Sequence, residues 1–184
     1  MKAYFYFSLF LLLTGCASAP VEVQRAAEHD APFAFNGRVA LKHGAQREKA
    51  GVRWVHKETE DEILLLAPLG QTVARIHRDE NRATMVASGK GYTAADMESL
   101  MQQVLGWQLP LSGLRYWVVA LPSTEGEFVI ERSDNGQVSL LIQQGWEISY
   151  SRYAAATPDA LPLRLTLKRQ GMEVVVLIDE WEAQ

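Results

Sequence analysis

Apolar and polar residues alternate in short runs along most of this chain, a pattern typical of strands that bury one face. In the first run, Phe35, Val39 and Leu41 alternate with polar residues, and the second run places Trp54 on the face opposite Arg53. Similar runs are expected at 63–67, 71–77, 82–88, 127–132, 138–142, 146–150, 163–167 and 172–181. The spacing predicts about nine strands joined by short turns.

The middle of the chain changes to the helical spacing of three and four residues. Thr93 and Asp96 resemble a capping box, and Gly106 follows as a stop signal, so we expect a first helix over Thr93 to Leu105. A second short helix is expected over Ser112 to Leu121. The two apolar stripes consist of Met97, Leu100, Met101, Val104 and Leu105, and of Leu114, Trp117, Val118 and Leu121.

The order of strands, helices and strands excludes the repeated crossovers of a parallel sheet. We therefore expect a mainly β (α+β) fold, an open, curled antiparallel sheet that forms an incomplete barrel, with the helices over one mouth or face. Periodicity alone does not distinguish a packed core from a cavity, and a packed core is the commoner outcome.

The N-terminal segment has the features of a secretory signal. Lys2 precedes an apolar run from Ala3 to Leu13, and Leu13-Thr14-Gly15-Cys16 has the form of a lipobox. We predict a lipoprotein signal peptide over residues 1–15 and lipidation of Cys16, the only cysteine, although a free thiol is the alternative. Residues 16–32 are small, polar or charged and indicate a flexible tether, and residues 33–184 are expected to form one domain.

Charge and composition argue against some classes of function. Without residues 1–15, 17 Lys and Arg stand against 22 Asp and Glu, a net charge of about −5 that argues against nucleic-acid binding. The residue after Cys16 is Ala17 and not the aspartate that resembles an inner-membrane retention signal. This residue therefore indicates the outer membrane of a Gram-negative cell. No other segment has the ~18 apolar residues of a membrane-spanning helix.

The apparent catalytic motifs lack their structural context. The glycines of Gly89-Lys90-Gly91 fit a turn better than a dinucleotide fingerprint, because no parallel crossover unit follows. Ser133-Asp134-Asn135 is interpreted as a hairpin turn. His29, His43, His56 and His77 are expected at the surface, and Glu60-Asp61-Glu62 on a solvated turn. We expect no enzyme, no metal and no cofactor.

Short motifs distributed over nearly all of the mature chain resemble the LolB family of outer-membrane lipoprotein receptors. They are the lipobox, Phe35-Asn36-Gly37-Arg38, Ala67-Pro68-Leu69-Gly70, Tyr92-Thr93-Ala94-Ala95-Asp96, Leu109-Pro110-Leu111, Leu114-Arg115-Tyr116-Trp117, Gln144-Gly145-Trp146 and Trp181. The resemblance implies a barrel with a helical lid over an apolar cavity for acyl chains. It also implies a monomeric receptor that accepts lipoproteins from the periplasmic carrier LolA and inserts them into the inner leaflet of the outer membrane.

The same resemblance assigns residues to these roles. The loop Pro68, Leu69 and Gly70 would meet outer-membrane lipid through Leu69. The cavity and its lid are expected to include Trp54, Leu66, Met97, Leu100, Met101, Val104, Trp117, Val118, Trp146 and Ile148, since methionine and tryptophan suit variable apolar ligands. The alternatives are a scaffolding lipoprotein, a LolA-like lipid carrier and a lipid-modifying enzyme.

Overall fold

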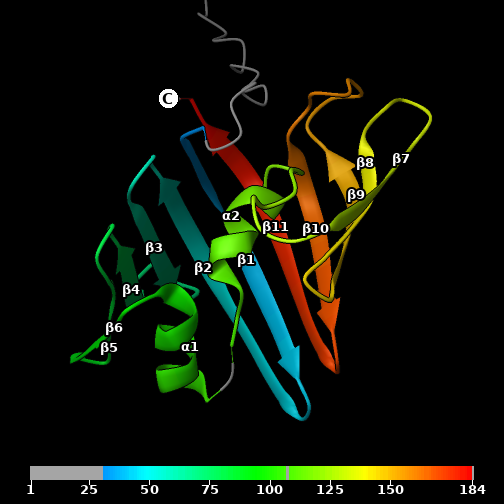
Figure 1. The fold of residues 1–184 in the computed structure, drawn as a ribbon. Helices are drawn as coiled ribbons and strands as arrows, with labels where there is room; N and C mark the ends of the chain where they lie inside the picture. The colour runs from blue at the N-terminus through cyan, green and yellow to red at the C-terminus, as the bar shows by residue number, and fades with distance from the viewer. Residues whose placement is uncertain (1–30, 107, 184) are drawn as a thin grey trace, which may run out of the picture.

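A single antiparallel sheet of eleven strands forms most of the molecule, in a computed structural model that describes residues 31–106 and 108–183 (Figure 1). The strands are β1 (Phe33–His43), β2 (Gln46–His56), β3 (Asp61–Leu66), β4 (Thr72–Arg78), β5 (Ala83–Ala87), β6 (Lys90–Ala94), β7 (Phe128–Arg132), β8 (Val138–Gln143), β9 (Trp146–Tyr153), β10 (Pro162–Arg169) and β11 (Met172–Glu182). Their order is β6-β5-β4-β3-β2-β1-β11-β10-β9-β8-β7. The expected fold class is confirmed.

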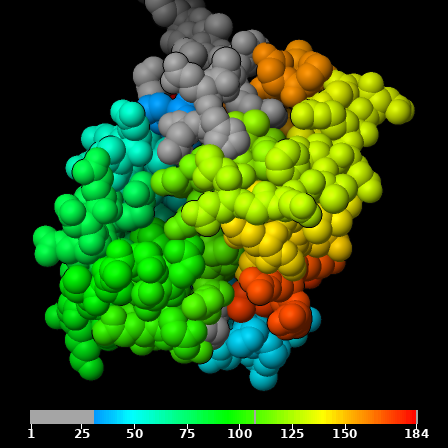
Figure 2. Space-filling view, in the orientation of Figure 1, coloured from blue at the N-terminus to red at the C-terminus, as the bar shows by residue number. Residues whose placement is uncertain are grey.

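The first and last strands lie side by side at the centre of the sheet. β1 pairs with β2 on one side and with β11 on the other. The sheet curls around the helices α1 (Met97–Leu105) and α2 (Leu111–Trp117), which lie on its concave face (Figure 1). In the space-filling view, the green and yellow-green part of the chain that contains the helices covers much of this face (Figure 2). The edge strands β6 and β7 pair with only one neighbour each among the described residues, so the barrel is open.

The strand β6 was not predicted, because Gly89 and Gly91 were interpreted together as a turn. Gly89 does lie in the turn, with φ of +75°, whereas Gly91 pairs with Val86 in the sheet. Thr93 also pairs in β6, so the predicted capping box is wrong. Asp96 caps α1 instead, since its carboxylate accepts a 2.6 Å hydrogen bond from the backbone of Ser99.

The strand turns lie alternately at two ends of the sheet. One end, here called the β1–β2 end, carries the turns at 43–46, 67–71, 88–89, 144–145 and 170–171. The other, here called the terminal end, carries the turns at 57–60, 79–82, 133–137 and 154–161, the start of β1 and the finish of β11. An aromatic cluster closes the terminal end, where the rings of Phe35 and Trp181 lie 5.3 Å apart and those of Phe33 and Trp54 5.5 Å apart.

Candidate functional site: an apolar cavity

A cavity of about 530 Å³ lies between the concave face of the sheet and the two helices. This volume is within the range of small-molecule sites. Most lining residues are apolar: Phe35, Val39, Leu41, Ala50, Val52, Trp54, Ile63, Leu65, Val73, Ile76, Met101, Val104, Leu105, Leu109, Leu111, Leu114, Val118, Val174 and Val176, with Gln46, Glu48 and Lys49 in addition. The sheet and both helices therefore enclose a space suited to a flexible apolar ligand.

The alternation of the strands produces this lining. Val52 and Trp54 of β2 face the cavity, whereas Arg53 lies on the other face and binds the carboxylate of Glu182 at 2.8 Å. On β1, Val39 faces the cavity, and Arg38 pairs with Asp179 on the outer face. The two faces predicted from the sequence are confirmed.

Exposure of the lining residues increases from one end of the cavity to the other. Phe35 and Trp54, near the terminal end, are buried. Gln46, Glu48 and Lys49, next to the β1–β2 turn, are exposed and supply the polar groups of the lining. The cavity is therefore closed by aromatic rings at the terminal end and opens at the β1–β2 end.

Four of the ten residues predicted for the cavity and lid line it: Trp54, Met101, Val104 and Val118. Met97 and Leu100 are buried on α1 but lie outside the lining, because this helix also packs against β5 and β6. Leu66 is the neighbour of the lining residue Leu65, and the strand alternation directs it to the other face.

The remaining three residues, Trp117, Trp146 and Ile148, are in the second half of the core. All three are buried, and the rings of Trp117 and Trp146 lie 6.4 Å apart. Packing of α2 on β8 and β9 fills the space that a ligand would need there. The interior thus combines a packed core, where Trp117 meets β8 and β9, with a cavity that both helices line elsewhere.

The predicted projecting turn lies between β3 and β4. Leu69 is 89% exposed at its tip, the largest exposure among the exposed large apolar residues. Gly70 has φ of +79°, and its N–H donates to the carbonyl of Ala67 at 2.8 Å, which closes the turn. Pro68, Leu69 and Gly70 therefore present an apolar side chain at the same end of the sheet as the cavity mouth.

A buried glutamine attaches α2 to the sheet. Gln143 accepts hydrogen bonds from the indole of Trp117 at 2.9 Å and from the backbone of Ser123 at 2.8 Å. Its amide nitrogen donates to the carbonyls of Ser123 and Glu125 at 3.0 and 2.9 Å. The hydroxyl of Tyr150 also donates to the carbonyl of Trp117. Gln143 was not predicted, because the expected strand ended at Ile142 and only the structure shows that Leu141 and Gln143 point inward.

Two hydrogen bonds at the surface of the protein join the first helix to the second. The carboxylate of Glu98 on α1 accepts hydrogen bonds from both the backbone and the hydroxyl of Ser112, each at 2.9 Å. These bonds are exposed to solvent, so they contribute less than the buried bonds of Gln143. The bonds between the two helices are therefore exposed, whereas the bonds of Gln143 that join α2 to the sheet are buried.

The comparisons with known proteins agree with this geometry. A sequence model of the family Outer membrane lipoprotein LolB matches residues 31–181. The chain belongs to the LolB family. It is 38% identical to Outer-membrane lipoprotein LolB of Chromobacterium violaceum, over 95% of this chain and 96% of that protein, and 35% identical to that of Nitrosomonas europaea, over 96% and 90%.

A solved structure shows the same fold. The crystal structure of a LolA superfamily protein from Nitrosomonas europaea superimposes with a TM-score of 0.52, covering 87% of this chain and 88% of that one. Its sequence identity is 9%, so the likeness shows the fold alone.

One polar cluster of this domain differs from the prediction. His56 and Asp61 were expected on the surface and on a solvated turn, but they are 1% and 3% exposed. The carboxylate of Asp61 lies 2.8 Å from Nδ1 of His56, and it accepts bonds from the indole of Trp54 at 2.9 Å and from Arg78 at 2.6 Å. The pairing of β2 with β3 places His56 directly opposite Asp61.

The pKa of Asp61 reflects two opposing influences. Burial, the largest of them, raises the pKa. The hydrogen bonds from His56, Trp54 and Arg78, together with the charge of His56, outweigh burial and hold the pKa below its usual value. Asp61 is therefore a buried carboxylate that its neighbours keep ionised.

The described residues contain neither a metal-binding cluster nor a helix that could cross a membrane. Among them, no cluster of His, Cys, Asp and Glu is arranged to hold a metal ion. None of the described helices combines the length and apolar character needed to cross a membrane. Cys16, the predicted signal peptide and most of the predicted tether lie outside the described residues, so lipidation remains a prediction.

Proposed function

We propose that this chain is an outer-membrane receptor that accepts lipoproteins from a LolA-like carrier by enclosing their acyl chains, and then places them in the inner leaflet of the outer membrane. The open apolar cavity supports this proposal most directly. Membership of a family described as outer-membrane lipoproteins supports the location. A scaffolding lipoprotein would not need such a cavity beneath its helices.

Acyl chains explain why a cavity is required. Each methylene that leaves water gains about 0.8 kcal/mol, so an acylated protein needs an apolar container at every step between membranes. The cavity offers aliphatic and aromatic walls and the flexible Met101. A tenfold preference over the carrier requires only about 1.4 kcal/mol, which differences in cavity contacts supply without a nucleotide or a catalytic step.

The arrangement of the ends supports transfer toward a membrane. The proposed anchor at Cys16 holds the domain of residues 33–184 through the tether of residues 16–32. The cavity mouth and Leu69 share the β1–β2 end, so a chain that leaves the cavity emerges on the side of the apolar turn. We propose that Leu69 enters the lipid while the mouth faces the leaflet, and that one monomer suffices.

The test replaces a lining residue of α1 that is not fully buried. Val104→Glu places a carboxylate in the cavity, and Gln103→Glu places the same group on the exposed face of the same helix. Both changes are made in a chain with Cys16→Ala, which keeps it off the membrane. Leu100 is unsuitable because it is fully buried, so Leu100→Glu would test folding instead.

Transfer of an acylated lipoprotein from the carrier is then measured in solution. We expect Val104→Glu to lower transfer at least about tenfold, because the buried carboxylate costs more than 1.4 kcal/mol. Gln103→Glu should transfer normally. Equal transfer by both variants, with both folded, would contradict an acyl-chain cavity at this place.

A further inference from the structure

Charge is distributed unevenly between the two ends of the sheet. Six Lys and Arg and three Glu lie in the turns of the β1–β2 end and their flanks, at 42–49, 67–73, 86–91, 144–147 and 168–173. Five Lys and Arg and seven Asp and Glu lie in the corresponding segments of the terminal end, at 57–61, 78–83, 132–138 and 152–162. The protein is acidic overall, yet its β1–β2 end is basic.

The exposed apolar residues gather at this same end. The exposed large hydrophobic residues of the described chain are Leu69, Val73, Val86, Leu105, Phe128, Val129 and Ile142. Val73 and Val86 flank the turns at 67–71 and 88–89, and Phe128 pairs with the last residue of β8. Leu105 is the last residue of α1, which runs toward the β1–β2 turn (Figure 1). Apolar and basic groups therefore share one end.

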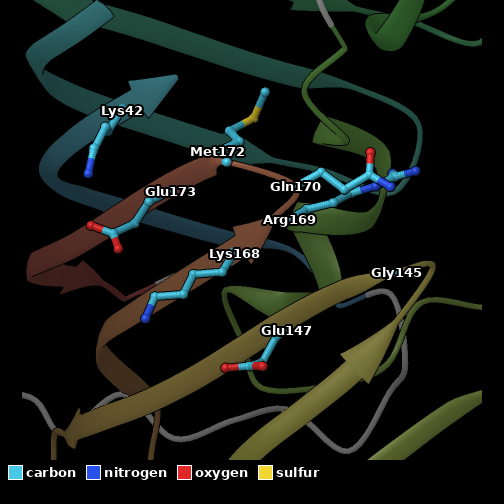
Figure 3. Close-up of a pocket in the computed structure, with 9 residues that line it drawn as sticks. Lys42, Gly145, Glu147, Lys168, Arg169, Gln170, Met172 and Glu173 are labelled. Carbon is cyan, nitrogen blue, oxygen red and sulfur yellow. The ribbon is translucent and has the colours of Figure 1, made fainter. Parts of the chain in front are cut away.

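A row of charged side chains crosses the outer face at this end. Direct pairing joins Glu147 to Lys168, Lys168 to Glu173, Glu173 to Lys42, and Lys42 to Arg47. Figure 3 shows the first four of these side chains side by side on neighbouring strands, while Arg169 runs to the other side. The row borders a hollow of about 450 Å³ around the β10–β11 turn.

The cations of this row are available to a ligand. Lys42, Lys168 and Arg47 are exposed, and none of them forms an ion pair with a carboxylate of the described residues. Arg169 lies with its guanidinium carbon 5.9 Å from the ring of Trp146, on the inner side of the same turn. Cations thus stand on both sides of the hollow.

We propose that the β1–β2 end is a docking surface for anionic phospholipid, in which Lys42, Lys168 and Arg169 bind headgroup phosphates. The proposal rests on the proposed function, because it specifies the membrane surface that receives the lipoprotein. A lipid surface fits better than an acidic protein, since exposed apolar residues lie on strands to either side of the cations and a bilayer accepts both kinds of group at its interface. The acidic terminal end would turn away from the same surface.

The lipid composition of vesicles tests this docking surface. The chain with Cys16→Ala is mixed with phosphatidylcholine vesicles that contain or lack a minor fraction of phosphatidylglycerol, and co-sedimentation is measured. We expect stronger binding to the anionic vesicles and loss of this difference at about 1 M salt, where the screening length falls to about 3 Å. Lys42→Gln with Lys168→Gln should weaken binding to anionic vesicles about 25-fold, at about 1 kcal/mol per cation.

A matched control removes two cations from the other end. Lys57→Gln with Arg152→Gln changes the net charge equally, and both residues are exposed at the terminal end. This control should bind anionic vesicles as the parent does. An equal loss in both double variants, or equal binding to both kinds of vesicle, would overturn the proposal.

A last comparison separates this proposal from the function on which it rests. Transfer from the carrier in solution, without vesicles, should be unchanged in Lys42→Gln with Lys168→Gln. If that transfer falls while vesicle binding stays normal, the cations serve the carrier and the lipid proposal is wrong. If the parent accepts no lipoprotein but shows the lipid preference, the receptor function fails and the lipid surface stands.

Discussion

The indole N–H of Trp117 donates a 2.9 Å hydrogen bond to the buried side chain of Gln143, which joins α2 to β8 across 26 positions of the chain. The same oxygen accepts the N–H of Ser123. One amide group therefore fixes both the end of α2 and the loop that follows it. This hydrogen bond fixes α2, which lines the cavity through Leu111 and Leu114, although neither Trp117 nor Gln143 lines it.

Loss of this amide should destabilise the protein markedly. Gln143→Leu leaves the indole of Trp117 and the backbone N–H and carbonyl of Ser123 without their partner, at about 1–3 kcal/mol for each unsatisfied group. The carbonyl of Glu125 keeps the hydroxyl of Ser123 and the amide of Gln144, each at 3.3 Å. We expect a loss of at least about 3 kcal/mol in the free energy of unfolding, measured by urea denaturation. The neighbouring Gln144→Leu removes an exposed amide with longer contacts, 3.5 Å to the hydroxyl of Ser123 and 3.3 Å to the carbonyl of Glu125, and should cost less than about 1 kcal/mol. Similar losses would show that the network is not the cause.

The bond between the helices should control access to the cavity. Glu98→Ala removes both bonds to Ser112 on the surface, so the free energy of unfolding should fall by no more than about 1 kcal/mol. Because α1 carries Met101 and Val104 over the cavity, release of a fluorescent fatty acid should be faster. Stopped-flow dissociation measures this rate, and Gln103→Ala provides the control. Unchanged release would show that α1 is held by its packing alone.

The buried carboxylate predicts loss of stability in acid. The pKa of Asp61 is below its usual value in the folded state, so its contribution is present above the unfolded pKa of about 3.9 and disappears as the pH falls through the folded value. Denaturation curves from neutral pH to pH 2 should show this fall. Asp61→Asn should be less stable at neutral pH and should lose part of the acid dependence. The exposed Glu58→Gln should keep the full dependence.

The projecting turn should separate capture from release. Leu69→Glu leaves the cavity intact, so capture from the carrier should be normal, whereas insertion into liposomes should fail because a charged tip is costly to place in lipid. Leu69→Met keeps an apolar tip and should insert normally. The two steps are measured by transfer from carrier to receptor and from receptor to liposomes. An equal effect on both steps, or none on either, would make Leu69 an ordinary turn residue.

Sequence patterns were sufficient on β1, on β2 and at the turn after β3, where local alternation and turn residues decide the structure. They placed Val52 and Trp54 opposite Arg53, and they placed Leu69 at a turn. They failed where a distant strand decides the environment. Asp61 belongs to an acidic run that resembles a turn, and only its pairing with His56 and its bond to Arg78 bury it.

The cavity shows a second limit of local patterns. Alternation correctly directed Trp146 and Ile148 inward, since both are buried. It could not show that Trp117 of α2 packs on this part of the sheet, while the two helices leave space over β1 to β4 and β11. Leu66 was misplaced for a different reason, because an apolar run on both faces gives no sign of which residue faces inward.

The position of β1 sets a minimum length for a tether between a lipidated Cys16 and the domain. The strand begins at the terminal end, and its 11 residues run about 35 Å toward the end that bears the mouth. A lipid at Cys16 can therefore share a bilayer with Leu69 only if the chain before Phe33 doubles back along the whole domain. Sixteen residues separate Cys16 from Phe33, and they reach at most about 55 Å when extended. With a lipid at Cys16, the tether is long enough for the cavity mouth to face the leaflet. Deleting half of the tether would hold the mouth away from the leaflet.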